Sequence, residues 1–412
     1  MLNKQWDSAT ARWVSNSSND YDSDGCIEWT GWVMADVFDG PEVTISGVAP
    51  DSLGNTYIIG ENGYSQYNVS IGGCVWYENE GPQSYVNPVF IVKLDASGTC
   101  EWKLNPSTNL SETDAELKDI FVDGNDGIYV TGWYADDDFG FGDSIEFDNC
   151  VEASECTSGG FVAKVAANGT WEWARSIDYD GTDDGRIQPW RIVVDGNGDY
   201  VVYGGCEGYI APNSECLEMP YSSPVSTFVM KFGGGNGTLQ WAKSLDPISW
   251  AHNGYISIDS NNDIYVSGNF GCQYNPCNVI DDLDPIHHFG SVSLFIAKLW
   301  ENGTWAWINN AGQQSSCSNA PGPTWTSLGA AVVTDSDGGL YVTGNYHKIN
   351  WDNSGNTIGY CSTATMNFGS ASVTADGPAL FLAKANTSTG TWEWAIGANG
   401  DSNEYVNDLS VN

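Results

Sequence analysis

The chain has 412 residues and a formal charge of −39, although only 16% of its residues are charged. The excess of negative charge reflects a lack of bases, since 14 Lys and Arg stand against 53 Asp and Glu. Such a surface repels phosphate backbones and anionic lipid head groups, so it disfavours nucleic-acid and membrane-surface roles and leaves cations, neutral glycans and basic proteins as partners.

The N-terminal segment MLNKQWDSAT lacks the basic and apolar regions of a secretory signal, so we expect a mature chain or an excised segment. No apolar run along the sequence is long enough to span a bilayer, which predicts no membrane insertion.

Residues 20–25 read DYDSDG and are followed by an acid in the ninth position of the motif. Carboxylates at alternate positions converge on one point when a glycine permits the turn, which suits the oxygen-rich shell of Ca²⁺. We expect a structural calcium here and no other cofactor, with a plain acidic turn as the alternative. The ligands would be Asp20, Asp22, Asp24 and Glu28.

A phrase of the form D-x-x-x-G/D-x-Y-V-x-G recurs at intervals of about seventy residues. A second phrase follows each copy, such as FVAKVAANGTWEW, and both phrases alternate apolar and polar residues around a Gly/Asn/Asp turn. This pattern predicts two hairpins, and thus four short strands A to D, in each repeat. The first phrase begins at Asp51, Asp123, Asp195, Asp259 and Asp335, and the second closes at Trp102, Trp173, Trp241, Trp307 and Trp394.

Four-stranded units of this kind close as the blades of a β-propeller. We therefore predict an all-β fold and a single domain over 1–412, a six-bladed propeller of antiparallel blades. The sixth blade would be shared between the termini, at about 1–34 plus 405–412, and would close the ring without exposed sheet edges. The other blades are expected at about 41–104, 117–175, 189–243, 254–309 and 328–396.

A lysine precedes each C–D turn at a constant place in the repeat. Counting from the two-residue turn Asn168-Gly169 places Lys164 opposite Trp173, on the same face of the sheet. We expect the lysine stem to lie along the indole and its charge over the ring, in a structural role. Two repeats have a longer C–D turn, which leaves the corresponding register open.

The phrases YVTG, FVAK and NGTWEW resemble the repeats of a bacterial and archaeal extracellular β-propeller family, and the likeness covers essentially the whole chain. The resemblance implies a propeller in an extracellular or cell-surface setting. It carries no shared catalytic residues, so it predicts fold rather than activity.

In a propeller the A–B and C–D turns lie on one face, and the B–C and D–A connections lie on the other. The B–C connections of this chain are long and dissimilar, which makes their face the expected binding surface. It is rich in aromatic and acidic residues, which suit the C–H faces and hydroxyls of a sugar ring. The candidate ligand-binding residues are Trp76, Trp133, Asp136, Asp137, Asp138, Trp250, Trp325 and Trp351.

The chain contains 11 Cys in spacings that fit neither a zinc ribbon nor a redox CxxC, so loop disulfides in an oxidising compartment are expected. Sequons such as those at Asn16, Asn68 and Asn109 suit a secreted, glycosylated protein. Cys26, Cys74 and Cys100 are left without an assigned partner. The expected pairs are Cys150 with Cys156, Cys206 with Cys216, Cys272 with Cys277, and Cys317 with Cys361.

No GxSxG elbow, HExxH or P-loop is present, so no catalytic residue is assigned. The sequence therefore favours a non-enzymatic extracellular propeller that binds a glycan or a surface protein. A polysaccharide-active hydrolase or lyase using loop carboxylates is the first alternative. A structural subunit of a surface layer or filament, joined to flanking segments or self-assembled, is the second.

Overall fold

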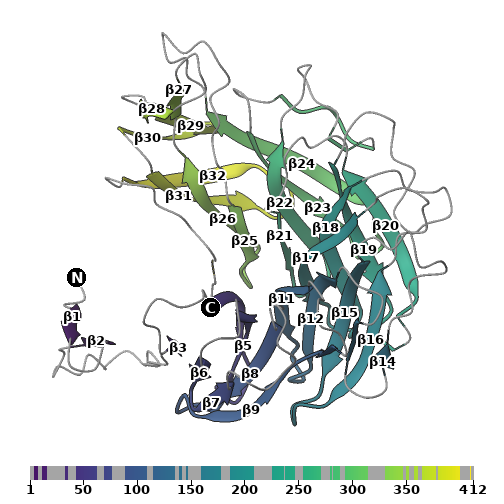
Figure 1. Cartoon of the computed structure of the whole chain (residues 1–412). Coiled ribbons are helices and arrows are strands. Elements are labelled where there is room, and N and C mark those ends of the chain that lie inside the picture. The colour runs from purple at the N-terminus through teal and green to yellow at the C-terminus, as the bar shows by residue number, and fades with distance from the viewer. Residues whose placement is uncertain are drawn as a thin grey trace.

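The computed structural model is all-β in the part of the chain it describes, and no helix there could cross a bilayer. Figure 1 shows the strands grouped into small sheets around an arc. The described residues are 4–7, 12–15, 33–35, 43–62, 69–76, 89–108, 115–134, 139–141, 145–146, 159–177, 186–207, 225–235, 237–245, 254–270, 279–280, 282–287, 293–313, 330–346, 349–351, 357–360, 364–376, 379–399 and 409.

Five antiparallel sheets contain the four strands A to D that the repeat predicts, in the expected order. We call them blades 1 to 5. They are blade 1, β4(Val43–Pro50), β5(Thr56–Asn62), β8(Val89–Leu94), β9(Cys100–Leu104); blade 2, β11(Ala115–Val122), β12(Ile128–Tyr134), β15(Gly159–Val165), β16(Trp171–Ile177); blade 3, β17(Arg186–Val194), β18(Tyr200–Glu207), β19(Val225–Phe232), β20(Leu239–Leu245); blade 4, β21(Tyr255–Ile258), β22(Ile264–Phe270), β23(Ser293–Leu299), β24(Trp305–Gln313); and blade 5, β25(Ala330–Thr334), β26(Gly339–Tyr346), β31(Ala379–Asn386), β32(Trp392–Asn399).

The remaining strands form small sheets in the connections. β1 to β3 precede blade 1, β10 lies between blades 1 and 2, and the others lie in the B–C connections within blades 1, 2 and 5. They are β1(Lys4–Asp7), β2(Arg12–Ser15), β3(Val33–Ala35), β6(Val69–Ile71), β7(Cys74–Trp76), β10(Ser107–Thr108), β13(Phe139–Phe141), β14(Ile145–Glu146), β27(Ile349–Trp351), β28(Thr357–Tyr360), β29(Ala364–Phe368) and β30(Ala371–Ala375).

The B–C connections, predicted as loops, are therefore partly strands. In blade 5 the connection forms the hairpin β29-β30, whose first strand pairs with the end of β24 in blade 4. Strands β6 and β7 of blade 1 also form a hairpin, and β3 pairs with β6. Hydrophobic residues drive this docking, since Met366 and Phe368 of β29 are fully buried in the same core as blades 4 and 5.

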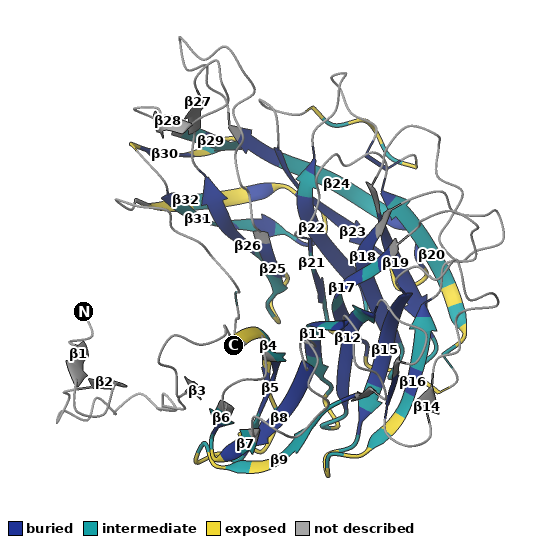
Figure 2. Cartoon of the chain, viewed as in Figure 1, coloured by how far each residue is buried: buried dark blue, intermediate teal, exposed yellow. Residues whose placement is uncertain are grey.

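The core lies between blades, and Figure 2 shows it as dark blue middle strands. Every residue of the C strands β8 and β23 is buried, whereas the outer strands β9 and β16 are mostly intermediate or exposed. The middle strands read as continuous apolar runs because both of their faces are covered, as in sheets buried on both sides. In blade 1 the hairpin β6-β7 covers one of these faces.

The two outermost blades carry exposed apolar side chains on their outermost strands. On the first strand of blade 1, Val48 is 54% exposed, whereas the equivalent Ile120 of blade 2 is 6% exposed. At the other end, Ile396 on the last strand of blade 5 is 58% exposed. The predicted sixth blade and C-terminal strand lie mostly outside the described residues. Within the N-terminal part expected for this blade, β2 pairs with β1.

Candidate functional site

Each A–B turn is built around the aspartate that opens the repeat phrase. In blade 1 the Asp51 carboxylate accepts hydrogen bonds from the backbone N–H groups of Leu53 and Asn55, each at 2.9 Å. Burial alone would raise the pKa of Asp51, but the hydrogen bonds, led by those from Asn55, outweigh it and lower this pKa. The repeat aspartate is thus a turn residue whose carboxylate holds its own backbone.

The predicted register of lysine and tryptophan is confirmed, and it also holds where the C–D turn is longer. Lys164 lies opposite Trp173, and Lys231 lies opposite Trp241. In blades 1, 2, 4 and 5, however, the lysine lies over the tyrosine of strand B rather than over the closing tryptophan. Lys164 Nζ lies 5.3 Å from the centroid of Tyr129, which it faces across strands B and C. A lysine on a central strand has neighbours on both sides, and the turn-based count considered only one.

The closing tryptophan instead fastens its blade to the next one. Trp102 Nε1 donates to Ala167 O, in the C–D turn of blade 2, at 3.0 Å. The turn glycine of that blade, Gly169, lies so close to the indole that an added Cβ would be 2.9 Å from it. Equivalent contacts join Trp241 to Glu301 O and Trp307 to Thr387 O, each at 3.1 Å.

The interface between blades 2 and 3 departs from this pattern. Trp173 stacks on Tyr200, with ring centroids 5.5 Å apart, and Arg175 lies against the turn glycine Gly237. A cavity of about 530 Å³ opens at this interface, on the face of the A–B and C–D turns. This face was not the one expected to bind.

The expected face carries a cluster at the ends of the inner strands of blades 1 and 2. Trp133 is half-buried, and its Nε1 donates to Glu116 Oε2 at 3.1 Å. Lys118 pairs with the other carboxylate oxygen of Glu116. Burial, and then the negative charge of Glu116, raise the pKa of Glu61, while Lys118 lowers it. We call Glu61, Glu116, Lys118 and Trp133 the Trp133 cluster.

Of the other candidate ligand-binding residues, Trp76 ends β7 and Trp351 ends β27, so both lie on strands rather than in open loops. The disulfide candidate Cys206 lies on β18.

No group of three or more acidic, His or Cys side chains suited to a metal occurs in the described ranges. The following predictions concern residues outside those ranges: Asp136, Asp137, Asp138, Trp250 and Trp325; the calcium ligands Asp20, Asp22, Asp24 and Glu28; and the disulfide candidates Cys150, Cys156, Cys216, Cys272, Cys277, Cys317 and Cys361.

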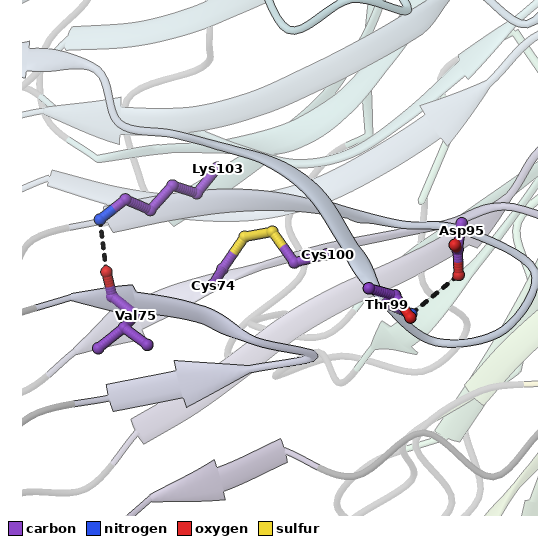
Figure 3. The surroundings of a disulfide bond; sticks show 6 residues. All are labelled: Cys74, Val75, Asp95, Thr99, Cys100 and Lys103. Carbon is purple, nitrogen blue, oxygen red and sulfur yellow. Dashed lines mark hydrogen bonds between the residues drawn. A yellow bond between two sulfur atoms is a disulfide. The ribbon is translucent and has the colours of Figure 1, made fainter.

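A disulfide joins Cys74 and Cys100, two residues for which the sequence left the partner open. It ties the hairpin β6-β7 to the outer strand of the same blade, and Lys103 Nζ donates to Val75 O at 2.6 Å beside it (Figure 3). A disulfide indicates that the chain folds in an oxidising environment.

The position of Cys100 explains its pairing. Blades 2 and 5 have Trp171 and Trp392 at this place, and there the indole packs on an aromatic residue of the B–C connection. The ring centroids of Trp171 and Phe141 are 4.6 Å apart, and those of Trp392 and Phe368 are 5.0 Å apart. An alignment of the repeats would therefore have pointed to a cysteine in the B–C connection of blade 1.

No protein-family model matches the chain, and no curated protein sequence matches it. Among solved structures, it is similar to a protein of unknown function from Bacteroides caccae, with 11% identity over 88% of this chain and 84% of that one, at a TM-score of 0.36. It is also similar to virginiamycin B lyase from Staphylococcus aureus, with 10% identity, 88% of each chain and a TM-score of 0.34. The polysaccharide lyase Uly1 is similar at 9% identity, over 88% of this chain and 81% of that one, at a TM-score of 0.40. At such low values, these similarities carry no information on ligand or activity.

Proposed function

We propose that the protein is an extracellular, non-enzymatic binding propeller that recognises a glycan or another cell-surface component through the face of its B–C and D–A connections. The Trp133 cluster is the observation that supports this most. It joins a half-buried indole to two carboxylates and an ammonium group at the end of the inner strands.

This combination of groups matches what a sugar requires. An indole held at its edge by the bond to Glu116 offers an apolar face to the C–H groups of a pyranose. Carboxylate oxygens accept from hydroxyls, and the ammonium of Lys118 donates to them. The net charge of −39 favours neutral or basic polysaccharides over acidic ones.

The test is calorimetric titration with soluble dextran, xylan, chitosan oligomers and alginate. We expect saturable binding of a neutral or basic polymer, weakened at least tenfold in Trp133→Ala. Trp300→Ala is the matched control, because Trp300 is 44% exposed in a C–D turn on the opposite face. Equal affinity in the two variants, or no binding to any polymer, would overturn the proposal.

A polysaccharide-active hydrolase or lyase is the second candidate, and the raised pKa of Glu61 favours it. A carboxylic acid whose pKa is raised beside a second carboxylate is the arrangement of a general acid and its partner. Chromatography after prolonged incubation separates the two functions. Products that disappear in Glu61→Gln would establish the enzyme, whereas binding without products supports the binding module.

The extracellular location is supported by the disulfide, by the sequons and by the resemblance of the YVTG, FVAK and NGTWEW phrases to extracellular propeller repeats.

We also propose the structural calcium at Asp20, Asp22, Asp24 and Glu28. Addition of Ca²⁺ to chelator-treated protein should raise the melting temperature, and Asp22→Asn should abolish that rise.

We propose further that a sixth blade closes the ring between blades 5 and 1. The support is the exposure of Val48 and Ile396 at the two ends, where equivalent positions elsewhere face a neighbouring blade. If the sixth blade covers these side chains, Val48→Asp and Ile396→Asp should each lower the free energy of unfolding by about 1.5–3 kcal/mol. Losses within about 0.5 kcal/mol, typical of open surface, would contradict closure. Urea denaturation measures both.

A further inference from the structure

The cavity between blades 2 and 3 lies away from the predicted binding surface. Residues of both blades form its walls. Blade 2 contributes the charged side chains Asp123, Asp126, Lys164 and Glu172 and the ring of Tyr129. Blade 3 contributes Asn197 and the backbone of three glycines. At about 530 Å³, the volume falls in the range of small-molecule sites.

The cavity arises from one position of the A–B turn. The fourth residue of this turn has φ > 0 in every described blade, and in blades 2 and 4 it is Asp126 and Asn262 rather than glycine. Each of these side chains caps the turn of the preceding blade. Asp126 accepts from Ser52 N and Ser52 Oγ, both at 2.9 Å, and Asn262 Oδ1 accepts from Gly196 N at 2.9 Å.

Blade 3 has Gly198 at this position, so no side chain reaches the turn of blade 2. A Cβ added to Gly198 would meet nothing within 4 Å, and the same holds for Gly235 on the same wall and for Gly124, which corresponds to Ser52. The space that an oxygen-bearing side chain fills in two other interfaces is therefore open here. The indole does not fill it either, because Trp173 is stacked on Tyr200.

The groups around this space favour a neutral, hydroxylated ligand. Three acidic residues and one lysine line the cavity, and this balance of charge disfavours anions. The ammonium of Lys164 already pairs with Glu172 at 3.2 Å, so a cationic ligand would compete with it. The carboxylates keep lone pairs and the ammonium keeps N–H groups beyond these bonds, and hydroxyl groups use both kinds of partner.

We propose that this cavity binds one neutral saccharide unit, with a ligand hydroxyl oxygen taking the place that Asp126 and Asn262 occupy in the neighbouring interfaces. This site is separate from the Trp133 cluster, since it lies on the opposite face of the blades, and it does not depend on the function proposed for that cluster.

The decisive variant is Gly198→Asn, which copies the cap of blade 4 into blade 3. Asparagine tolerates φ > 0, and its side chain would fill the cavity and reach Gly124. Gly54→Asn is the matched control, because it makes the same change at the equivalent turn position of blade 1, where φ is 83°. Gly235→Gln fills the cavity from blade 3 independently, in case Gly198→Asn fails to fold.

Binding is measured by saturation-transfer NMR and calorimetry with glucose, galactose, mannose, xylose and their disaccharides. We expect at least one of these sugars to bind wild type and Gly54→Asn with equal affinity. The same sugar should bind Gly198→Asn and Gly235→Gln at least tenfold more weakly. Binding unaffected by both filling variants, binding of methylammonium or spermidine alone, or no binding would overturn the assignment. A sugar whose binding is lost in Trp133→Ala but kept in Gly198→Asn would belong to the other site.

Discussion

The ion pair of blade 3 gives the sharpest test of how the repeat is stabilised. Lys231 Nζ lies 2.7 Å from Asp195 Oδ2, and the two side chains are 2% and 0% exposed. Blade 3 has Val201 opposite this lysine, where the other blades have tyrosine, and the ammonium lies beside the turn aspartate. Lys231→Met would leave the carboxylate buried without a counter-charge, at a cost of about 3–5 kcal/mol.

Urea denaturation followed by tryptophan fluorescence and circular dichroism measures this loss. Lys164→Met is the matched control in blade 2, because its pair with Glu172 is 25% and 43% exposed and should contribute at most about 1 kcal/mol. Adding Asp195→Asn to Lys231→Met should recover part of the loss, since asparagine keeps the acceptor for the turn N–H groups without the charge. Two results would contradict this account of the ion pair. One is a loss of unfolding free energy in Lys231→Met no larger than in the control, and the other is a further loss when Asp195→Asn is added.

Three further outcomes are expected. Replacing Cys74 and its partner by serine should lower the free energy of unfolding by up to about 3.5 kcal/mol, the loop-entropy contribution for a separation of 26 residues. In a melt under reducing conditions, wild type should lose more stability than this variant, by about the same amount. Gly390→Ala should cost about 1–3 kcal/mol more than Gly198→Ala in urea denaturation, because only the Cβ at 390 would collide with Trp307, at 2.5 Å. A backbone N–H donates to Asp335 and lowers its pKa, so its stabilisation is present above the ordinary value of 3.8 and lost as the pH falls through the lower folded value. Asp335→Asn should flatten the fall in melting temperature between pH 5 and pH 2 (about the range in which carboxylates protonate), and an unchanged slope would contradict this.

The strands of the five four-stranded sheets could be predicted because the A–B and C–D turns that join them recur along the sequence. Blade 2 was expected at about 117–175, and its strands run from Ala115 to Ile177. The register of Lys164 and Trp173 followed from the turn alone, since a short hairpin loop fixes which residues face each other.

Contacts across blade interfaces could not be predicted in the same way. The closing tryptophan was expected to serve its own blade, yet Trp102 bonds to Ala167 of the next one. Counting along a hairpin shows what lies opposite within a sheet, but not what another sheet brings against it. The cavity was missed for the same reason, because it depends on Gly198 of one blade and the turn of another.

The direction of the tryptophan contacts bears on how the protein is made. Each indole bonds to a carbonyl that follows it in the chain, 65 residues later for Trp102, 60 for Trp241 and 80 for Trp307. During synthesis from the N-terminus, a blade can pair its own four strands as soon as they emerge, but its outer indole waits until the next blade has been translated. At these three interfaces the newly made blade completes its predecessor, and a ribosome pause inside the later repeat leaves the earlier indole exposed to solvent and to chaperones.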